Sequence, residues 1–364
     1  MDRILPVVGV AVALFLVYRK WKSSSGRVRE EDLSGAAAEL GFLPAGQLDT
    51  ERVGPPDPQV TAVLEAVRAG DWQAGARFLE EAGRNWQERD RRSSFLADEA
   101  MKDDSWLLAW RTARPQDPGA ALVHAESLIY LAWELRGSKQ AEHTTREQFE
   151  GFHRVLEQAR AACREARELG GDDPCPYIVE LPLAMGLGYP RADFEALWAE
   201  IVERDPHHLA AHTSALQYWC AKWRGSHELA LEFGREAAAK GAPGQLLTSV
   251  LLDAYFEYEF AHGDLDPDEF YKRPEIVAAV DAALVDVAAA HAADPGDRRI
   301  TAVRHTLANM LFWQDRYEAA VEQFRLVDGW IGSTPWSYSG NPVETYVKAR
   351  DYSAAQVLKA GAGA

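Results

Sequence analysis

The sequence predicts an all-α protein built from stacked antiparallel helical hairpins. Runs of about 11–20 residues carry apolar side chains at i, i+3, i+4 and i+7, the spacing of one helix face. Short breaks rich in Gly and Pro separate these runs, and the alternating β-branched patterns typical of strands are absent. An aromatic residue followed by small residues also recurs at predicted hairpin turns, as in Asp71-Trp72 and Asp351-Tyr352.

Residues 1–22 are predicted to be a transmembrane anchor. Residues 4–18 have no charged side chain, and Trp21 with the stems of the neighbouring basic residues can extend the span. The larger basic flank follows the apolar run, which predicts a single-pass protein of the cell membrane with a cytoplasmic C-terminal domain. A secretory signal peptide has an apolar core of similar length, so secretion after cleavage is the alternative.

Residues 23–58 are predicted to be a linker, because they combine a Ser-rich run, mixed charges and the turn-rich GPPDP at 54–58. A short helix is expected within it, over 33–42. Residues 59–360 are predicted to form one α-helical repeat-like domain, either a single solenoid or two lobes hinged near 172–176. Its expected helices are 60–68, 72–82, 92–102, 106–112, 120–135, 147–169, 174–185, 193–203, 209–223, 228–239, 244–260, 274–293, 301–313 and 317–327.

The best-formed hairpin is Thr301–Val327. It resembles a tetratricopeptide repeat, which implies a TPR-like α-solenoid with a concave face that binds peptides or proteins. The proline that closes such a repeat is missing, because Gly332 occupies its position. The matching residues are Leu307, Ala308, Leu311, Tyr317, Ala320 and Phe324.

A second resemblance lies in residues 218–230, YWCAKWRGSHELA, and in the helices from 122 to 258. These are similar to an uncharacterised bacterial helical domain that contains a Trp, Lys and Gly element of this kind. No function is known for that family, so the similarity implies helical architecture only.

The repeat resemblance nominates the partner-binding residues. It implies that His305, Asn309 and Phe312 face the concave surface and contact a protein or peptide partner. Trp219 and Trp223 could line a groove as well, and the alternative is that they fill contacts between helices.

Composition and motifs argue against several other functions. The net charge of −17 disfavours a nucleic-acid backbone as the main partner. Nucleotide-binding glycine loops and nucleophile elbows are absent from the sequence. The three cysteines, Cys163, Cys175 and Cys220, form no C-x-x-C pair, which fits a reducing compartment, and Cys220 is predicted to be a buried structural thiol.

One histidine cluster and one acidic cluster resemble metal sites but lack part of the ligand pattern that such sites need. His208 and His212 are spaced i, i+4, but no third ligand accompanies them. The acidic run that starts at Asp264 imitates a calcium loop, yet Glu269 stands where that loop needs glycine, so a helix N-cap at Asp266 explains the acids better. We therefore predict no metal, no cofactor and no catalytic residue.

The function expected from these patterns is that of a membrane-anchored interaction or scaffold protein. The alternative is an enzyme or small-ligand-binding protein that uses an all-helical pocket. A closed cavity lined by titratable groups with shifted pKa values would favour the enzyme.

Overall fold

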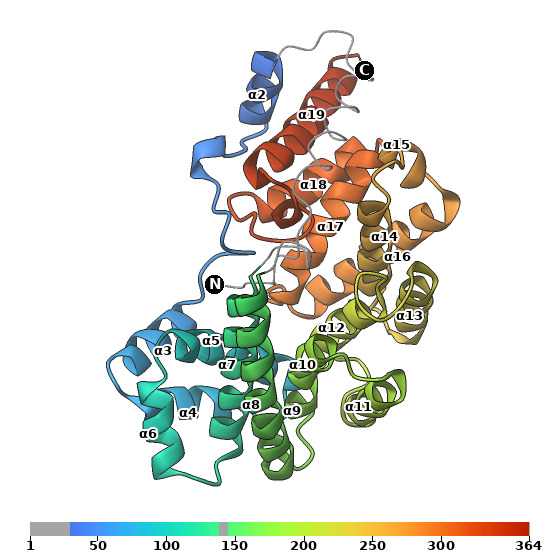
Figure 1. The fold of residues 1–364 in the computed structure, drawn as a ribbon. Coiled ribbons are helices and arrows are strands. Elements are labelled where there is room, and N and C mark those ends of the chain that lie inside the picture. The colour runs from blue at the N-terminus through green and yellow to red at the C-terminus, as the bar shows by residue number, and fades with distance from the viewer. Residues whose placement is uncertain (1–29, 138–144, 364) are drawn as a thin grey trace. The chain divides into compact units, whose positions relative to one another are not determined.

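The computed structural model describes residues 30–137 and 145–363, and these residues form an almost entirely helical chain (Figure 1). The one β contact among them is an isolated parallel bridge between Asp49 and Trp330. The prediction of an all-α protein is confirmed for this part of the chain. The predicted anchor, 1–22, lies outside the described residues.

The chain divides into two compact units. Unit 1 comprises residues 56–226, and unit 2 combines residues up to Pro55 with residues 227–363. The alternative of a hinge near 172–176 does not match this division, because Asp173 and Cys175 lie inside unit 1. The helices of unit 1 are α3 (Pro58–Arg68), α4 (Trp72–Glu80), α5 (Trp86–Lys102), α6 (Ser105–Ala113), α7 (Pro118–Arg136), α8 (Arg146–Gly170), α9 (Cys175–Ile178), α10 (Glu180–Leu187), α11 (Arg191–Arg204) and α12 (Leu209–Trp219).

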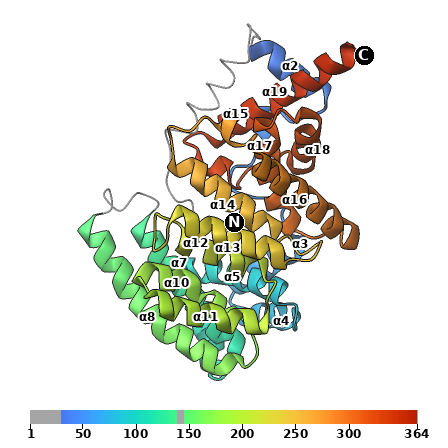
Figure 2. The same ribbon diagram turned by 90° about the vertical axis from the view of Figure 1, so that its right-hand side faces the viewer.

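Unit 2 contains helices from both ends of the chain. Within it α2 packs against α19, which Figures 1 and 2 both show, and the consecutive pairs α13/α14 and α17/α18 pack closely. Its helices are α2 (Glu30–Glu39), the 3₁₀ turn η1 (Ala45–Gln47), α13 (His227–Lys240), α14 (Thr248–Ala261), α15 (Pro267–Phe270), α16 (Pro274–Ala293), α17 (Arg299–Trp313), α18 (Tyr317–Val327), the 3₁₀ turn η3 (Trp336–Tyr338) and α19 (Pro342–Ala362).

Helix starts follow the capping chemistry of the sequence. An Asp or Asn side chain accepts a main-chain N–H, and a proline follows at the first helical position, where its missing N–H is no loss. This arrangement starts α3 at Asp57, α7 at Asp117, α15 at Asp266 and α19 at Asn341. The predicted N-cap at Asp266 is confirmed.

Several helices differ from the predicted bounds: α2 lies three residues earlier than 33–42, α14 begins at Thr248 rather than 244, and the predicted 174–185 is divided into α9 and α10. Helix α5 begins at Trp86 rather than 92, because its polar first turn has no apolar pattern and is instead capped by Asn85. Helix α12 ends at Trp219 rather than 223. The chain folds back there so tightly that a Cβ on Gly225 would lie 1.8 Å from the Trp219 carbonyl oxygen. The predicted turn at Asp351-Tyr352 is wrong, since α19 runs through it and Asp351 pairs with Arg350.

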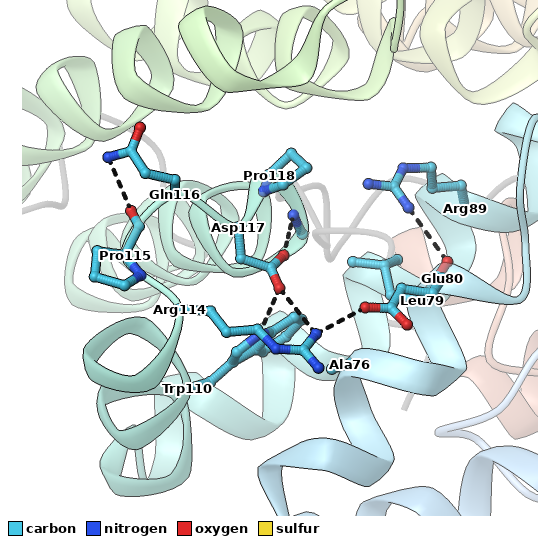
Figure 3. A pocket seen from close by; sticks show the side chains of 11 residues that line it. Ala76, Leu79, Glu80, Arg89, Trp110, Arg114, Pro115, Gln116, Asp117 and Pro118 are labelled. Carbon is cyan, nitrogen blue, oxygen red and sulfur yellow. Dashed lines mark hydrogen bonds and ion pairs between the residues drawn. The ribbon is translucent and has the colours of Figure 1, made fainter.

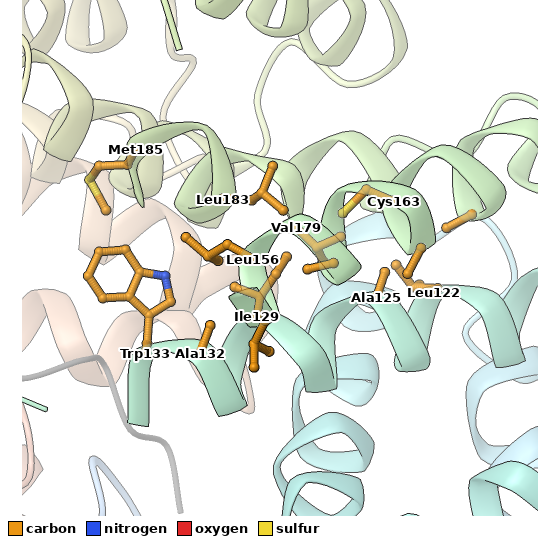
Figure 4. Packing of buried hydrophobic residues seen from close by; sticks show 14 of the residues in the cluster. Leu122, Ala125, Ile129, Ala132, Trp133, Leu156, Cys163, Val179, Leu183 and Met185 are labelled. Carbon is orange, nitrogen blue, oxygen red and sulfur yellow. The ribbon is translucent and has the colours of Figure 1, made fainter. Parts of the chain in front are cut away.

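The core of unit 1 lies between α7, α8 and the α9–α10 segment (Figure 4). Trp133 and Ile129 of α7 face Leu156 and Cys163 of α8, and Leu183 of α10 closes the cluster. A second cluster, around the fully buried Trp110, joins α3 to α7. The one-sided apolar patterns of these helices therefore meet as the sequence predicts.

Among the described residues, helix α16 has the length and apolar composition that a membrane span needs. It packs against α14 and α17, and Ile276, Val280 and Val287 are buried in that contact. The same composition is found in core helices of helical proteins, so α16 by itself is weak support for a membrane span.

The predicted linker is only partly a linker. Residues 30–55, which we call the arm, lie on unit 2 and bury Leu33, Ala37, Phe42 and Val53. The structure thus assigns this stretch to the folded body, and the connection between the units begins at Pro55-Pro56.

Candidate functional site

Main-chain hydrogen bonds hold the second half of the arm in unit 2, beside the burial of its apolar side chains. The Asp49 N–H donates to the Gly329 carbonyl at 2.8 Å, and the Ile331 N–H donates to the Asp49 carbonyl at 2.7 Å. The Gly332 N–H donates to the Arg52 carbonyl at 2.8 Å. The bonds at Asp49 form an isolated parallel bridge with Trp330, and main-chain bonds of this kind do not depend on the side chains of the segment that is held.

Side chains of unit 2 fix both ends of this stretch. Arg350 of α19 donates from Nη1 to the Leu43 carbonyl at 2.9 Å, and its guanidinium lies 5.1 Å from the ring centre of Phe42. The Leu43 N–H donates to Asp328 at 2.7 Å. Arg298, next to α17, donates to the Pro55 carbonyl at 3.0 Å. We call the surface formed by Arg298, Thr301, His305, residues 328–332 and Arg350 the arm groove.

Gly332 lies where the arm comes closest. A Cβ built on it would stand 2.7 Å from the Arg52 nitrogen and 2.7 Å from the Glu51 carbonyl carbon. Any side chain at position 332 would collide with the main chain of Glu51 and Arg52, which cannot change rotamer as a side chain can. The structure thus gives Gly332 a local role, since a residue without a side chain at this position admits the arm.

His305 connects the arm to the loop after α18. Its Nδ1 accepts a hydrogen bond from Trp336 Nε1 at 3.0 Å, which leaves Nε2 to donate to the Val53 carbonyl at 3.4 Å. The ring is completely buried, and this burial lowers the pKa of His305 to about 4. The neutral imidazole is therefore part of the structure at neutral pH.

The structure separates the other predicted contact residues from any open surface. Asn309 and Phe312 are 7% and 2% exposed, and Phe312 packs against Tyr352 of α19 at a ring distance of 6.1 Å. Of the predicted trio, His305 alone is shown touching an extended chain, and that chain is the protein's own arm.

The two predicted tryptophans lie in unit 1. Trp219 is buried and meets Phe194 edge-on at 5.7 Å. Trp223 is half-buried and meets Trp133 edge-on at 5.4 Å. These placements match the alternative reading, in which tryptophans fill contacts between helices.

Sequence reasoning missed the arm groove because its contacts join residues about 280 positions apart, as in Asp49 and Gly329. Two signals could have pointed to it. One is the glycine at position 332, and the other is the number of apolar residues, Phe42 and Val53 among them, in a stretch predicted to be a linker.

Unit 1 contains a pocket of about 570 Å³ at the start of α7 (Figure 3). Leu79, Trp110 and Pro118 supply apolar walls. Arg114 lies at its mouth and pairs with Glu80 at 3.0 Å and Asp117 at 3.4 Å. Because the charges are balanced, this pocket selects no ion of either sign.

A second hollow of about 680 Å³ lies between α8, α10 and α11. Glu180 in its wall pairs with Arg167 at 3.1 Å and accepts a hydrogen bond from Tyr189 at 3.0 Å. Arg204 lies over Tyr177 at 4.3 Å.

The most perturbed acids of unit 1 lie elsewhere. Burial raises the pKa of Asp90 and of Glu126, and negative charge on Asp173 and on Asp90 raises them further. Glu126 accepts hydrogen bonds from Ser93, Ser94 and Tyr130. Neither Asp90 nor Glu126 lines either of the two pockets, so the shifted pair is not presented to a ligand there.

The predicted near-miss metal sites have structural roles. His208 is the N-cap of α12 and accepts the Ala211 N–H, while His212 lies against Trp198. In the part of the chain that the structure describes, no group of three His, Cys, Asp or Glu residues is arranged to hold a metal ion.

Comparison of the chain with models of protein families, with curated proteins and with solved structures finds no match. The geometry of the arm groove is therefore the main guide to function.

Proposed function

We propose that this protein is a helical interaction module that binds extended polypeptide in the arm groove. One observation carries the proposal: the groove already holds residues 42–55 of the chain itself, which contain the 3₁₀ turn η1 and no α-helix, through main-chain hydrogen bonds at Asp49 and Arg52. A groove that pairs with backbone accepts any segment that can lie flat in it, and side-chain pockets then set the preference.

The preferred partner can be described from the bound segment. It has an aromatic residue at the position of Phe42, where Arg350 offers a cation–π contact. Ten or so residues later it has a small apolar residue at the position of Val53, which is 8% exposed. The partner in this proposal is a peptide or protein segment.

The TPR-like solenoid is part of the same proposal. Pairwise packing of α3/α4, α7/α8, α13/α14 and α17/α18 supports a series of hairpins. In this proposal the hairpin α17/α18 differs from the others in binding a polypeptide segment. Glycine at position 332, where such a repeat has proline, leaves room for the backbone of that segment.

We also propose that residues 1–22 tether the protein to the cell membrane with the helical body in the cytoplasm. The arm begins soon after this stretch and is bound to unit 2. In this proposal the anchor is therefore linked to unit 2 through the arm. Full-length protein should sediment with membranes and resist alkaline carbonate but not detergent. Release by carbonate, or digestion of the body by protease added outside intact spheroplasts, would contradict this placement.

An enzyme remains the alternative, and it finds less support in the geometry. An enzyme of this kind is expected to have a cavity lined by titratable groups whose pKa values are shifted. Asp90 and Glu126 have raised pKa values, but neither residue lines either of the two pockets.

Binding of a peptide in trans tests the proposed function. The probe is a fluorescent peptide with the sequence of residues 40–56, titrated onto three full-length proteins. The first is the unmodified chain, and the second carries Phe42→Ala and Val53→Asp, which weaken its own arm but leave the groove intact. The third adds Gly332→Val, which fills the groove with a side chain against the bound backbone.

We expect the arm-weakened chain to bind the peptide at least about tenfold more tightly than the unmodified chain, because a linked arm competes at millimolar effective concentration. The chain with Gly332→Val should not bind, although its helical circular dichroism is unchanged. A peptide carrying the Val53→Asp change is the matched control. Equal binding by all three proteins, or none by the arm-weakened chain, would refute the groove as a peptide site.

A further inference from the structure

We propose that the hollow between α8, α10 and α11 binds a small zwitterion whose carboxylate and ammonium lie at opposite ends of an apolar stem. All residues that line this hollow belong to unit 1, whereas the arm groove belongs to unit 2. The site is therefore independent of the proposed peptide binding.

The hollow has a basic wall and an acidic wall. Arg160 and Arg167 are seven residues apart on α8, and Asp193 and Glu200 are seven residues apart on α11. Seven residues are two helical turns, so each pair lies on one face of its helix, about 10 Å apart along the axis. Helices α8 and α11 both pack against the α9–α10 segment, and all four side chains line the same hollow.

Two of these four side chains already have a partner of opposite charge. Arg167 pairs with the buried Glu180 at 3.1 Å. Glu200 pairs with Arg204, one turn further along α11, at 2.7 Å. These pairs leave one charged residue on each wall for a ligand.

The charged residues that remain are Arg160 and Asp193. Arg160 pairs with Glu157 of its own helix at 3.2 Å, but both side chains are about half exposed, so a ligand can replace this weak pair. The Arg160 guanidinium also lies 5.5 Å from the ring centre of Tyr189, another residue of the lining. Within the residues that the structure describes, the Asp193 carboxylate forms no hydrogen bond or ion pair.

Most of the remaining lining is apolar. Leu187, Pro190 and Leu197 contribute to it together with the rings of Tyr177 and Tyr189. The volume of about 680 Å³ is typical of a small-molecule site. A ligand with a single charge would leave the opposite wall without a counter-ion, whereas a zwitterion pairs with both walls and covers the apolar lining with its stem.

Calorimetric titration of the full-length protein in detergent, with 6-aminohexanoate as the probe, tests this site. Hexanoate and hexylamine are the matched probes, because each keeps the stem and one of the two charges. At low ionic strength, where surface ion pairs are least screened, we expect 6-aminohexanoate to bind about fivefold more tightly than either matched probe.

Two variants assign the ends of the ligand. With Arg160→Gln, hexylamine should bind as tightly as 6-aminohexanoate, and with Asp193→Asn, hexanoate should do so. Arg154→Gln on α8 and Glu203→Gln on α11 are the controls, because both residues are exposed and lie outside the lining of the hollow. The controls should keep the preference for the zwitterion, and circular dichroism should show all four variants to be folded.

Three results would overturn the zwitterion site. One is equal binding of the three probes by the unmodified chain, and another is a preference that the control variants also abolish. The third is a dissociation constant above about 10 mM for 6-aminohexanoate. None of them affects the peptide titration, because that experiment reports on unit 2.

Discussion

Replacing Arg350 by methionine should destabilise unit 2 by about 3–5 kcal/mol, the usual cost of removing one partner from a buried ion pair. The Arg350 side chain is only 3% exposed and pairs with Asp328 at 3.0 Å and Asp351 at 2.8 Å. It also holds the Leu43 carbonyl of the arm. Methionine keeps the volume but leaves two carboxylates without their cation, so amide hydrogen exchange should speed up both in α19 and at Phe42 and Leu43.

Lys348→Met on the same helix is the matched control. Lys348 pairs with Glu344 one turn away near the surface, and such pairs contribute less than about 1 kcal/mol. Adding Asp328→Asn and Asp351→Asn to the Arg350 variant should restore part of the stability, because no charge is then left unpaired. Similar losses for both single variants, or no rescue, would show that charge pairing is not what Arg350 contributes.

Lowering the pH should loosen the arm through His305. In the folded chain the pKa of His305 is lowered to about 4, against 6.5 for an ordinary histidine. The unfolded state therefore gains a proton first as the pH falls. The stability that His305 contributes is complete above about pH 6.5 and is lost progressively toward pH 4. The full loss is about 3 kcal/mol, from 1.36 kcal/mol for each pKa unit.

The measurement is hydrogen exchange in α17 and in residues 49–55 at pH 7 and pH 5, compared with His305→Gln at the same pH. Glutamine cannot take the proton, so the difference between the two proteins isolates this residue. The comparison with the His305 variant is needed because Asp253 and Glu259 change the stability in the opposite direction as the pH falls. Burial raises their pKa to about 7, so their protonated forms stabilise the fold as the pH falls. An equal pH response in both proteins would exclude His305 as the cause.

The helices of this protein follow from local sequence to a large degree. The bounds predicted for 274–293 and 317–327 agree with α16 and α18 to the residue. Capping pairs such as Asp117-Pro118 and Asp266-Pro267 indicate where helices begin, because capping involves only neighbouring residues. The errors arose where local patterns are silent or ambiguous. The first turn of α5 is polar, and Asp351 pairs with its neighbour instead of capping a helix.

The candidate site was predictable only in part. His305 was predicted to contact a protein or peptide partner, and in the structure it is buried and contacts the Val53 carbonyl of the protein's own arm. The identity of that chain was not predictable, and Phe312, nominated beside it, is covered by α19. Whether a helix face is buried depends on which later segment packs over it. The sequence pattern of the helix itself does not indicate which segment that is.

The sequence alone thus determined that the described part of the chain is helical and where many of its helices begin and end, and it drew attention to the glycine at position 332. Only the tertiary structure showed why. The arm and the loop at 328–332 are nearly three hundred residues apart in sequence, and they meet through backbone atoms that every residue shares. Main-chain pairing leaves almost no trace in side-chain patterns. Its one trace here is the absence of a side chain at Gly332, where two backbones come too close for a Cβ.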